Sequence, residues 1–310
     1  MSNPKEQIFS DSEQLSAELV KELLKEKRSD RRWKNFRFIM WMTVIAVLFW
    51  TAWNSNYISP TALEGGYVSL IRMTGIIEPG ADLSAETLIP ALKQAFSDEH
   101  AKGVMLVINS EGGTPAQASI IHDAILYYKE KYHKKTIVVG EDFLASGAYY
   151  IAVAADQIYV NPNTITGSVG AIIKSFGFPE VLKKIGIERR VYMSGSAKDR
   201  MDPFLPASPA DVEKANQLLS EVQANFNRVV LDARRNKLHA DPATLFNGDF
   251  WSGSAAVKLG LVDGLGNMLD VLDKEFQVSR YHDYSPSSSL FNRMAGSLGY
   301  SLGAVFKALR

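Results

Sequence analysis

Strand-like and helix-like patterns alternate along this 310-residue chain between residues 67 and 160, and that alternation leaves few folds open. Residues 103–108 (GVMLVI) form an unbroken apolar run, which is typical of a strand in a sheet covered on both faces. Residues 136–139 (TIVV) repeat this pattern, and helix-like segments lie before and after it, at 115–128 and 151–155. The alternation predicts an α/β domain with a mainly parallel sheet.

Two turns follow these strands, and both are expected at the edge of the sheet where its parallel strands end. The first turn, at 109–114, contains Gly112 and Gly113, whose backbone N–H groups are not covered by a side chain. The second turn is predicted at 140–146 and ends on Ser146, directly before the small-residue helical run. A serine in that position is either an ordinary helix cap or a nucleophile beside free backbone N–H groups.

A nucleophilic serine needs a base that accepts its proton. None of the five histidines lies in a predicted strand-end loop, and their spacing gives no support to a Ser-His-Asp triad. A lysine is the alternative base, provided that its surroundings lower its pKa by several units from about 10.4. Lys198 is the candidate by its setting, because the small residues at 194–197 allow close approach. A lone lysine is otherwise a solvated surface residue.

Beyond residue 160 the pattern is less regular. It predicts a short helix at 179–185, a strand at 188–192 and a long amphipathic helix at 211–235. The compact body is predicted to span residues 67–281. Residues 282–310 form an apolar, glycine-interrupted tail, for which a membrane-surface helix, a docking segment on a neighbouring subunit and a loose tail all stay open.

The charges of the chain are unevenly distributed although their sum is zero, which gives no sign of a nucleic-acid surface. Seven basic and two acidic residues lie at 25–37, and sixteen uncharged residues follow at 38–53. A buried soluble helix would not carry such a basic flank, and a cleaved signal peptide would end in small residues, which 51–54 (TAWN) does not. The pattern therefore predicts an uncleaved membrane anchor whose basic side is cytoplasmic.

This interpretation divides the N-terminal region into a cytoplasmic basic tail at 1–35, a transmembrane anchor at 36–54 and a linker at 55–66. The body would then lie outside the cytoplasm, on the periplasmic side of the inner membrane in a Gram-negative cell. The chain has no cysteine, which excludes disulfides, thiolate nucleophiles and cysteine-based zinc sites.

Five motifs in the body occur in an order and at a spacing that resemble the signal peptide peptidase A family of membrane-bound serine proteases. They are Asn-Ser-x-Gly-Gly at 109–113, Ala-Ser-Gly-x-Tyr-Tyr at 145–150, Thr-Gly-Ser-x-Gly at 166–170, Ser-Gly-x-x-Lys-Asp at 194–199 and Gly-Leu-Val-Asp-x-Leu-Gly at 260–266. The resemblance implies a fold of the Clp protease/crotonase type, built from repeated ββα units.

The resemblance also implies a role for each matching residue. Ser146 would be the nucleophile and Lys198 the general base, while Ser168 would hydrogen-bond and orient the lysine amine. Gly113, with Gly112 beside it, would form the oxyanion hole. No metal or other cofactor is implied.

Substrates and partners follow from the same resemblance. Chains of this length in the family assemble into ring-shaped homo-oligomers in which the serine and the lysine of one site come from adjacent chains. The implied substrates are remnant signal peptides and other apolar or unfolded segments, which would be cleaved through an acyl-enzyme. Besides these peptides, the lipid bilayer is a predicted partner.

Two other functions stay open. A crotonase-like acyl-CoA enzyme would share the fold and would need neither Ser146 nor Lys198. A non-catalytic membrane scaffold would result if Glu111, where the family usually has proline, disturbed the oxyanion turn. We expect the Glu111 carboxylate to point to solvent.

Overall fold

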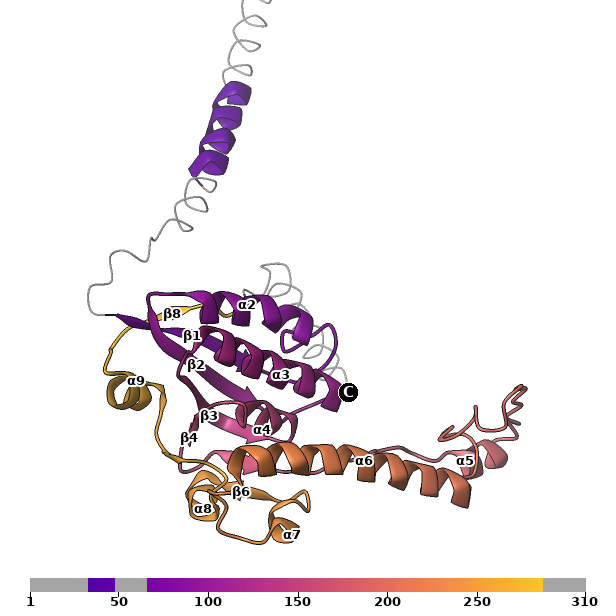
Figure 1. Ribbon diagram of the computed structural model, residues 1–310. Helices are drawn as coiled ribbons and strands as arrows, with labels where there is room; N and C mark the ends of the chain where they lie inside the picture. The colour runs from indigo at the N-terminus through magenta and orange to yellow at the C-terminus, as the bar shows by residue number, and fades with distance from the viewer. Residues whose placement is uncertain (1–32, 48–65, 287–310) are drawn as a thin grey trace, which may run out of the picture. The chain divides into compact units, whose positions relative to one another are not determined.

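The computed structural model describes residues 33–47 and 66–286 (Figure 1). The chain divides into two compact units, Met1–Ala62 and Leu63–Arg310. In the first unit, residues 33–47 form a helix with exposed side chains, and none of the helices within the described ranges is both long and apolar enough to cross a bilayer. The predicted anchor is therefore described only in part. Its residues 48–54 lie outside the described ranges, as do most of the predicted basic tail, linker and C-terminal tail.

The second unit is built around one sheet with the strand order β6-β5-β3-β2-β1-β8, and β4 pairs with both β3 and β7. All neighbouring strands are parallel except β5 and β6, which confirms the predicted α/β class with a mainly parallel sheet. The strands are β1 (Tyr67–Thr74), β2 (Ala101–Ser110), β3 (Thr136–Ala145), β4 (Gln157–Val160), β5 (Ile165–Gly167), β6 (Phe250–Ser252), β7 (Gly264–Leu265) and β8 (Tyr281–Asp283).

Strand β2 shows why both faces of the sheet are covered. Val104, Leu106 and Ile108 belong to the core cluster that includes residues of α2, α3 and α4, while Met105 and Val107 belong to a second cluster with residues of α9. An unbroken apolar strand places alternate side chains in two cores in this way (Figure 1). The helices are α2 (Ala85–Ser97), α3 (Pro115–Tyr132), α4 (Gly147–Ala152), α5 (Pro179–Lys184), α6 (Pro209–Arg234), α7 (Pro242–Leu245), α8 (Gly253–Leu259) and α9 (Met268–Phe276).

Two of the predicted element assignments are wrong. The turn predicted at 140–146 is mostly strand, because β3 continues to Ala145 and its last three residues pair with β5. The strand predicted at 188–192 does not form, since this segment has no neighbouring strand to pair with in the described chain. In both cases tertiary pairing, rather than local composition, decides the secondary structure.

Helix α6 packs against α4. It begins with a capping box between Ser208 and Asp211, and its buried residue Phe226 packs against Tyr150 of α4 with ring centroids 5.1 Å apart. The chain between β5 and α6, residues 168–208, runs beside α6 and carries α5 near the N-terminal end of that helix (Figure 1). We call residues 171–208 the arm.

Strand β8 spans the predicted boundary between the body and the C-terminal tail. It pairs with β1, and the hydroxyl of Tyr284 donates to Oδ2 of Asp98 at 2.8 Å. The hydroxyl of Tyr67 donates to the same oxygen at 2.7 Å. Burial raises the pKa of Asp98, but the hydrogen bonds outweigh it and hold that pKa below its ordinary value. Residues 282–284 are thus part of the folded body.

Candidate active site

Ser146 lies where β3 ends and the short helix α4 begins. Its φ of 53° and ψ of −122° are rare for a residue with a side chain, and its hydroxyl makes no capping hydrogen bond to α4. The strand beside it holds this conformation, because the Ser146 N–H donates to the carbonyl of Gly167 at 2.9 Å. Ser146 is therefore not an ordinary helix cap. A strained serine at a strand-to-helix turn, whose hydroxyl has no partner among the described residues, is the arrangement that a nucleophile would need.

The predicted oxyanion glycines lie directly against this turn. A Cβ on Gly112 would come within 2.8 Å of Ser146 Cβ and 2.7 Å of the Gly147 nitrogen. A Cβ on Gly113 would lie 2.0 Å from the carbonyl oxygen of Ile77, so no larger residue fits there. The structure thus brings Gly112, Gly113 and Ser146 together, as the motif spacing predicts.

Ile77 fixes the orientation of the glycine turn. Its N–H donates to the Gly112 carbonyl at 2.9 Å, and its carbonyl accepts from the Thr114 N–H at 2.7 Å. Neither bond involves the Gly113 N–H, which has no hydrogen-bond partner among the described residues. The Gly147 N–H also lacks a partner within its helix, because it belongs to the first turn of α4. Two backbone donors beside Ser146 are therefore free to bind an oxyanion.

Ser168 lies next to Ser146 across the β3–β5 pairing. Ala145 pairs with Gly167, so the two serines follow paired residues on neighbouring strands. Ser168 also has a positive φ, of 50°, and its hydroxyl lies 3.5 Å from the Gly248 carbonyl. Gly167 makes this turn possible, since its φ is +89° and a Cβ there would lie 2.8 Å from the Trp251 ring.

Lys198 is not brought to Ser146 within the chain. It lies exposed in the arm, two residues before Arg200, whose Nε is 3.6 Å from Asp211 in the first turn of α6. The α6 residues that line the Ser146 cleft begin at Leu218, which at 1.5 Å per residue is roughly 10 Å further along the helix, and Lys198 does not line that cleft. The structure therefore groups four of the five predicted site residues and leaves the lysine apart.

A cavity of about 610 Å³ opens beside Ser146, between α3, α4, α6 and the first residues of the arm. Gly113, Ser146 and Gly147 line one side of it. Arg228, on the exposed side of α6, is its one cationic side chain. Apolar side chains dominate the rest of the lining, namely Ala116, Ala118, Ile172, Ile173, Leu218, Leu219, Val222 and Phe226.

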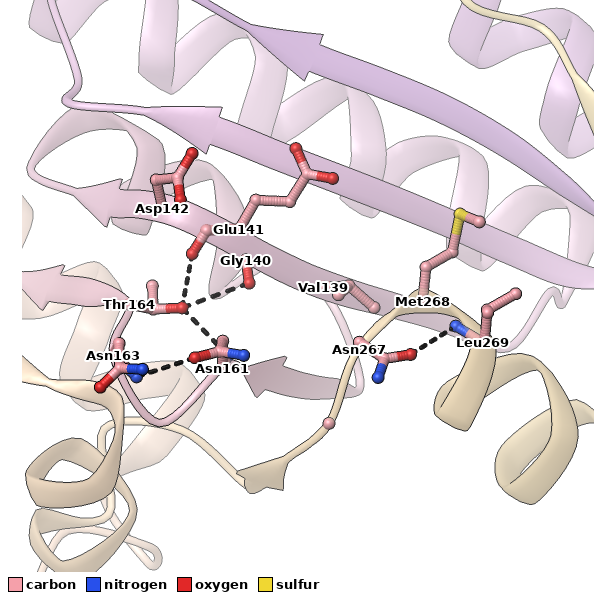
Figure 2. Close-up of a pocket in the computed structure, with 11 residues that line it drawn as sticks. Val139, Gly140, Glu141, Asp142, Asn161, Asn163, Thr164, Asn267, Met268 and Leu269 are labelled. Atoms are coloured by element: carbon pink, nitrogen blue, oxygen red, sulfur yellow. Dashed lines mark hydrogen bonds between the residues drawn. The ribbon is translucent and has the colours of Figure 1, made fainter.

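A second cavity, of about 560 Å³, lies on another part of the sheet, between β3, the 161–164 turn and the start of α9 (Figure 2). The hydroxyl of Thr164 donates to the backbone carbonyl of Glu141 and braces the bend in β3 there. Amide and carboxylate groups line this cavity, but none of the predicted catalytic residues does. We therefore place the candidate site at Ser146.

Glu111 and the histidines bear on the alternatives that the sequence left open. The Glu111 side chain is exposed, so solvent screens its charge. His122 is buried on α3, where burial lowers its pKa although Asp123 pairs with Nδ1 at 2.9 Å. The imidazole packs edge-on against Tyr150, with ring centroids 5.2 Å apart, and not against Ser146. The structure accordingly gives no support to a histidine base for Ser146.

Sequence reasoning missed two parts of this site. Ile77, which fixes the glycine turn, lies in an irregular segment and carries no motif. The apolar residues of α6 at 218–226 were predicted only as a packing face, although several of them line the cleft. Both contributions depend on contacts between segments that are distant in sequence, which local patterns do not report.

Comparison with known proteins identifies the family of the chain. The sequence profile of Peptidase family S49 matches residues 129–279, and that of Clp protease matches residues 70–166. A putative signal peptide peptidase SppA of Enterococcus faecium is 31% identical over 233 residues, covering 71% of this chain and 67% of that protein. The putative protease MJ0651 of Methanocaldococcus jannaschii is 29% identical over 235 residues, covering 73% and 74% of the two chains.

Another relative, named Na(+)/H(+) antiporter NhaA, comes from Brucella melitensis. It is 41% identical over 244 residues, which cover 77% of this chain but 33% of that protein. The chain thus spans about a third of that relative's length.

The fold and the profile matches together define a serine peptidase domain of the Clp protease type. The chain belongs to the signal peptide peptidase A family, peptidase family S49.

Proposed function

We propose that this protein is a membrane-anchored serine endopeptidase that uses a Ser146–Lys198 dyad. The observation that carries the proposal is the geometry at the β3–α4 junction. There a strained serine lies against the Gly112–Gly113 turn at the edge of an apolar cleft, and neither its hydroxyl nor the Gly113 N–H has a hydrogen-bond partner among the described residues. A nucleophile and an oxyanion donor beside a binding cleft are the parts that acyl transfer requires.

In the proposed mechanism, the neutral amine of Lys198 accepts the proton of Ser146 as the hydroxyl attacks the peptide carbonyl. The Gly113 N–H then stabilises the tetrahedral oxyanion, and Lys198 returns the proton to the leaving amine. Water, activated by the same lysine, hydrolyses the acyl-enzyme. Ser168, beside Ser146, would orient the lysine amine.

We propose that Lys198 reaches Ser146 from a neighbouring chain of a ring-shaped homo-oligomer. The separation of the two residues along α6 within one chain supports this arrangement. The exposed apolar side chains of the arm support it as well, since an unpaired surface of this kind is typical of an interface. They include Ile172, Phe176, Val181, Ile185, Ile187 and Tyr192.

The substrates that we propose are remnant signal peptides and other apolar or unfolded segments. The apolar lining of the cleft supports this choice, and the basic and apolar N-terminal segments support placement at the cytoplasmic membrane with the body outside the cytoplasm. Protease added to sealed, right-side-out membrane vesicles tests that placement. Digestion of the body supports it, and protection of the body contradicts it.

Cleavage of a fluorogenic signal-peptide analogue by detergent-solubilised full-length protein tests the dyad. Ser146→Ala should abolish cleavage and Lys198→Ala should lower kcat by about a thousandfold or more, because each residue takes part in the bond-making step. The wild-type rate should rise with pH, because the proposed mechanism needs an uncharged base. Lys93→Ala, at an exposed position of α2 outside the arm and the cleft, is the matched control. Retained activity in either dyad variant, or a rate that does not change with pH, contradicts the mechanism.

A further inference from the structure

The turn that carries Ser168 has little support from the sheet. Strand β5 ends at Gly167, and the chain then leaves along α6 into the arm. The 246–249 loop supplies part of the support that the sheet does not. The Ser168 N–H donates to the Asp249 carbonyl at 2.8 Å, and the Gly248 N–H donates to the Val169 carbonyl at 3.1 Å.

Gln223 on α6 ties these segments together. Its Oε1 accepts from the Ala171 N–H at 3.0 Å, and its Nε2 lies 3.3 Å from the Val169 carbonyl and 3.0 Å from the Phe246 carbonyl. Nε2 also donates to Oδ1 of Asn227, one turn further along the helix, at 2.7 Å. One half-buried carboxamide thus contacts the backbone just after Ser168 and the loop that supports Ser168.

We propose that Gln223 is a positioning residue of the active site. Its carboxamide fixes the Ser168 turn beside Ser146 and sets the direction in which the arm leaves toward Lys198. The proposal rests on the proposed function for the role of Ser168, and on the four contacts above for the clamp itself. A carboxamide has both the acceptor that Ala171 needs and two N–H groups, which are shared among the two carbonyls and Asn227.

Two substitutions distinguish the hydrogen-bonding role of Gln223 from a contribution of its side chain to packing. Gln223→Met keeps the length and the apolar stem but removes every hydrogen bond, while Gln223→Glu keeps an acceptor and places a carboxylate opposite two carbonyls. Gln217→Ala is the control, because Gln217 is exposed on the same helix and, among the described residues, its side chain hydrogen-bonds only with Lys214. Circular dichroism and size-exclusion chromatography establish that each variant is folded.

In the peptide cleavage assay, the Gln223 substitutions should change kcat but not KM. We expect kcat to fall about a hundredfold in both Gln223 variants with little change in KM, because a displacement of about 1 Å in a catalytic group costs that much. The Gln217→Ala protein should match the wild type. A residue that serves stability alone would lower the melting temperature and leave kcat per folded molecule unchanged, and that result overturns the proposal.

Hydrogen exchange distinguishes failure of this proposal from failure of the proposed function. In the Gln223→Met protein, amide exchange in residues 168–171 should be about tenfold faster than in the wild type or the Gln217→Ala protein. Equal exchange in the three proteins overturns the clamp, whatever the activity. If the wild type shows no Ser146-dependent cleavage, the proposed function fails, and the exchange measurement still decides whether Gln223 holds the turn.

Discussion

At the scale of single residues, both serines of the candidate site have a positive φ, which residues with side chains rarely adopt. Among the described residues five non-glycine positions have a positive φ, and Ser146 and Ser168 are two of them. His133 and Gln277, by contrast, are helix C-caps, where this conformation is common. Each such serine costs of order 1–3 kcal/mol, so the hydrogen bonds around both turns must offset that strain.

The oxyanion turn gives a prediction at the same scale. Gly113→Ala should lower kcat by about 100- to 1,000-fold, the usual loss for one oxyanion donor, because the added methyl displaces the turn from Ile77. Gly266→Ala, outside the arm and the cleft, is the matched control, since its Cβ would meet nothing closer than 3.6 Å. Steady-state kinetics on both proteins check this. A kcat for Gly113→Ala within twofold of the wild type would show that Gly113 N–H is not the oxyanion donor.

At the scale of elements, an ion-pair network ties the C-terminal end of α6 to the sheet. Nη1 of the buried Arg234 lies 3.0 Å from Oδ2 of Asp263, which also accepts from the Ile158 N–H at 2.8 Å. Lys237 contacts the other oxygen of Asp263 at 2.7 Å. Burial raises the pKa of Asp263, but these partners outweigh it and hold that pKa below its ordinary value. The network therefore fixes the helix that forms one wall of the cleft.

Replacement of Asp263 tests this network. Asp263→Asn should lower the free energy of unfolding by about 3–5 kcal/mol at pH 7, because it leaves Arg234 buried without a counter-charge. The folded-state pKa lies below the unfolded value of about 3.9, so the stabilising effect of the ionised carboxylate is complete above that pH. It is lost as the pH falls through the folded-state pKa.

Urea unfolding at several pH values measures the free energy of unfolding of the wild-type and Asp263→Asn proteins. The difference between the two free energies should narrow below about pH 4. Lys237→Gln is the control, because Lys237 is the half-exposed member of the network. This substitution should lower the free energy of unfolding by less than about 1 kcal/mol. A difference between the wild type and Asp263→Asn that stays constant down to pH 3 would contradict the assigned role of the carboxylate.

At the scale of the whole molecule, the folded body brings together the residues proposed as nucleophile and oxyanion hole, but not the proposed base. The exposed apolar side chains of the arm, which carries Lys198, have no covering element in the described chain. The missing base and the uncovered apolar side chains are both explained if the arm packs on a second copy of the chain and places Lys198 beside Ser146 of that copy. Oligomeric assembly would then be a condition for activity.

Mixing inactive variants tests this assembly. Ser146→Ala and Lys198→Ala chains should each be inactive, and after co-expression or subunit exchange the mixture should recover part of the wild-type kcat, because some sites then combine the intact residue of each chain. A mixture of Ser146→Ala with Ser146→Ala/Lys198→Ala is the control and should stay inactive. Absence of recovery in oligomers that are shown by mass to contain both chains would contradict a shared site.

Local patterns were sufficient for the framework of the fold and for part of the site. The apolar run at 103–108 reports burial on both faces of the sheet, because strand side chains alternate between two cores. The motif at 109–113 and Ser146 both follow strands that end at one edge, so parallel topology alone brings them together. The residues predicted for the nucleophile and the oxyanion hole accordingly lie side by side.

Tertiary structure decided what depends on contacts between distant segments. Because residues 143–145 pair with β5, most of the segment predicted as a turn at 140–146 is strand. Residues 188–192 form no strand, because no strand of the described chain pairs with them. Neither the strain at Ser146 and Ser168 nor the clamp from Gln223 has a local signature, because each arises from backbone held by segments far along the chain. The sequence by itself determined which residues can do chemistry, and the packing decided which of them meet within one chain.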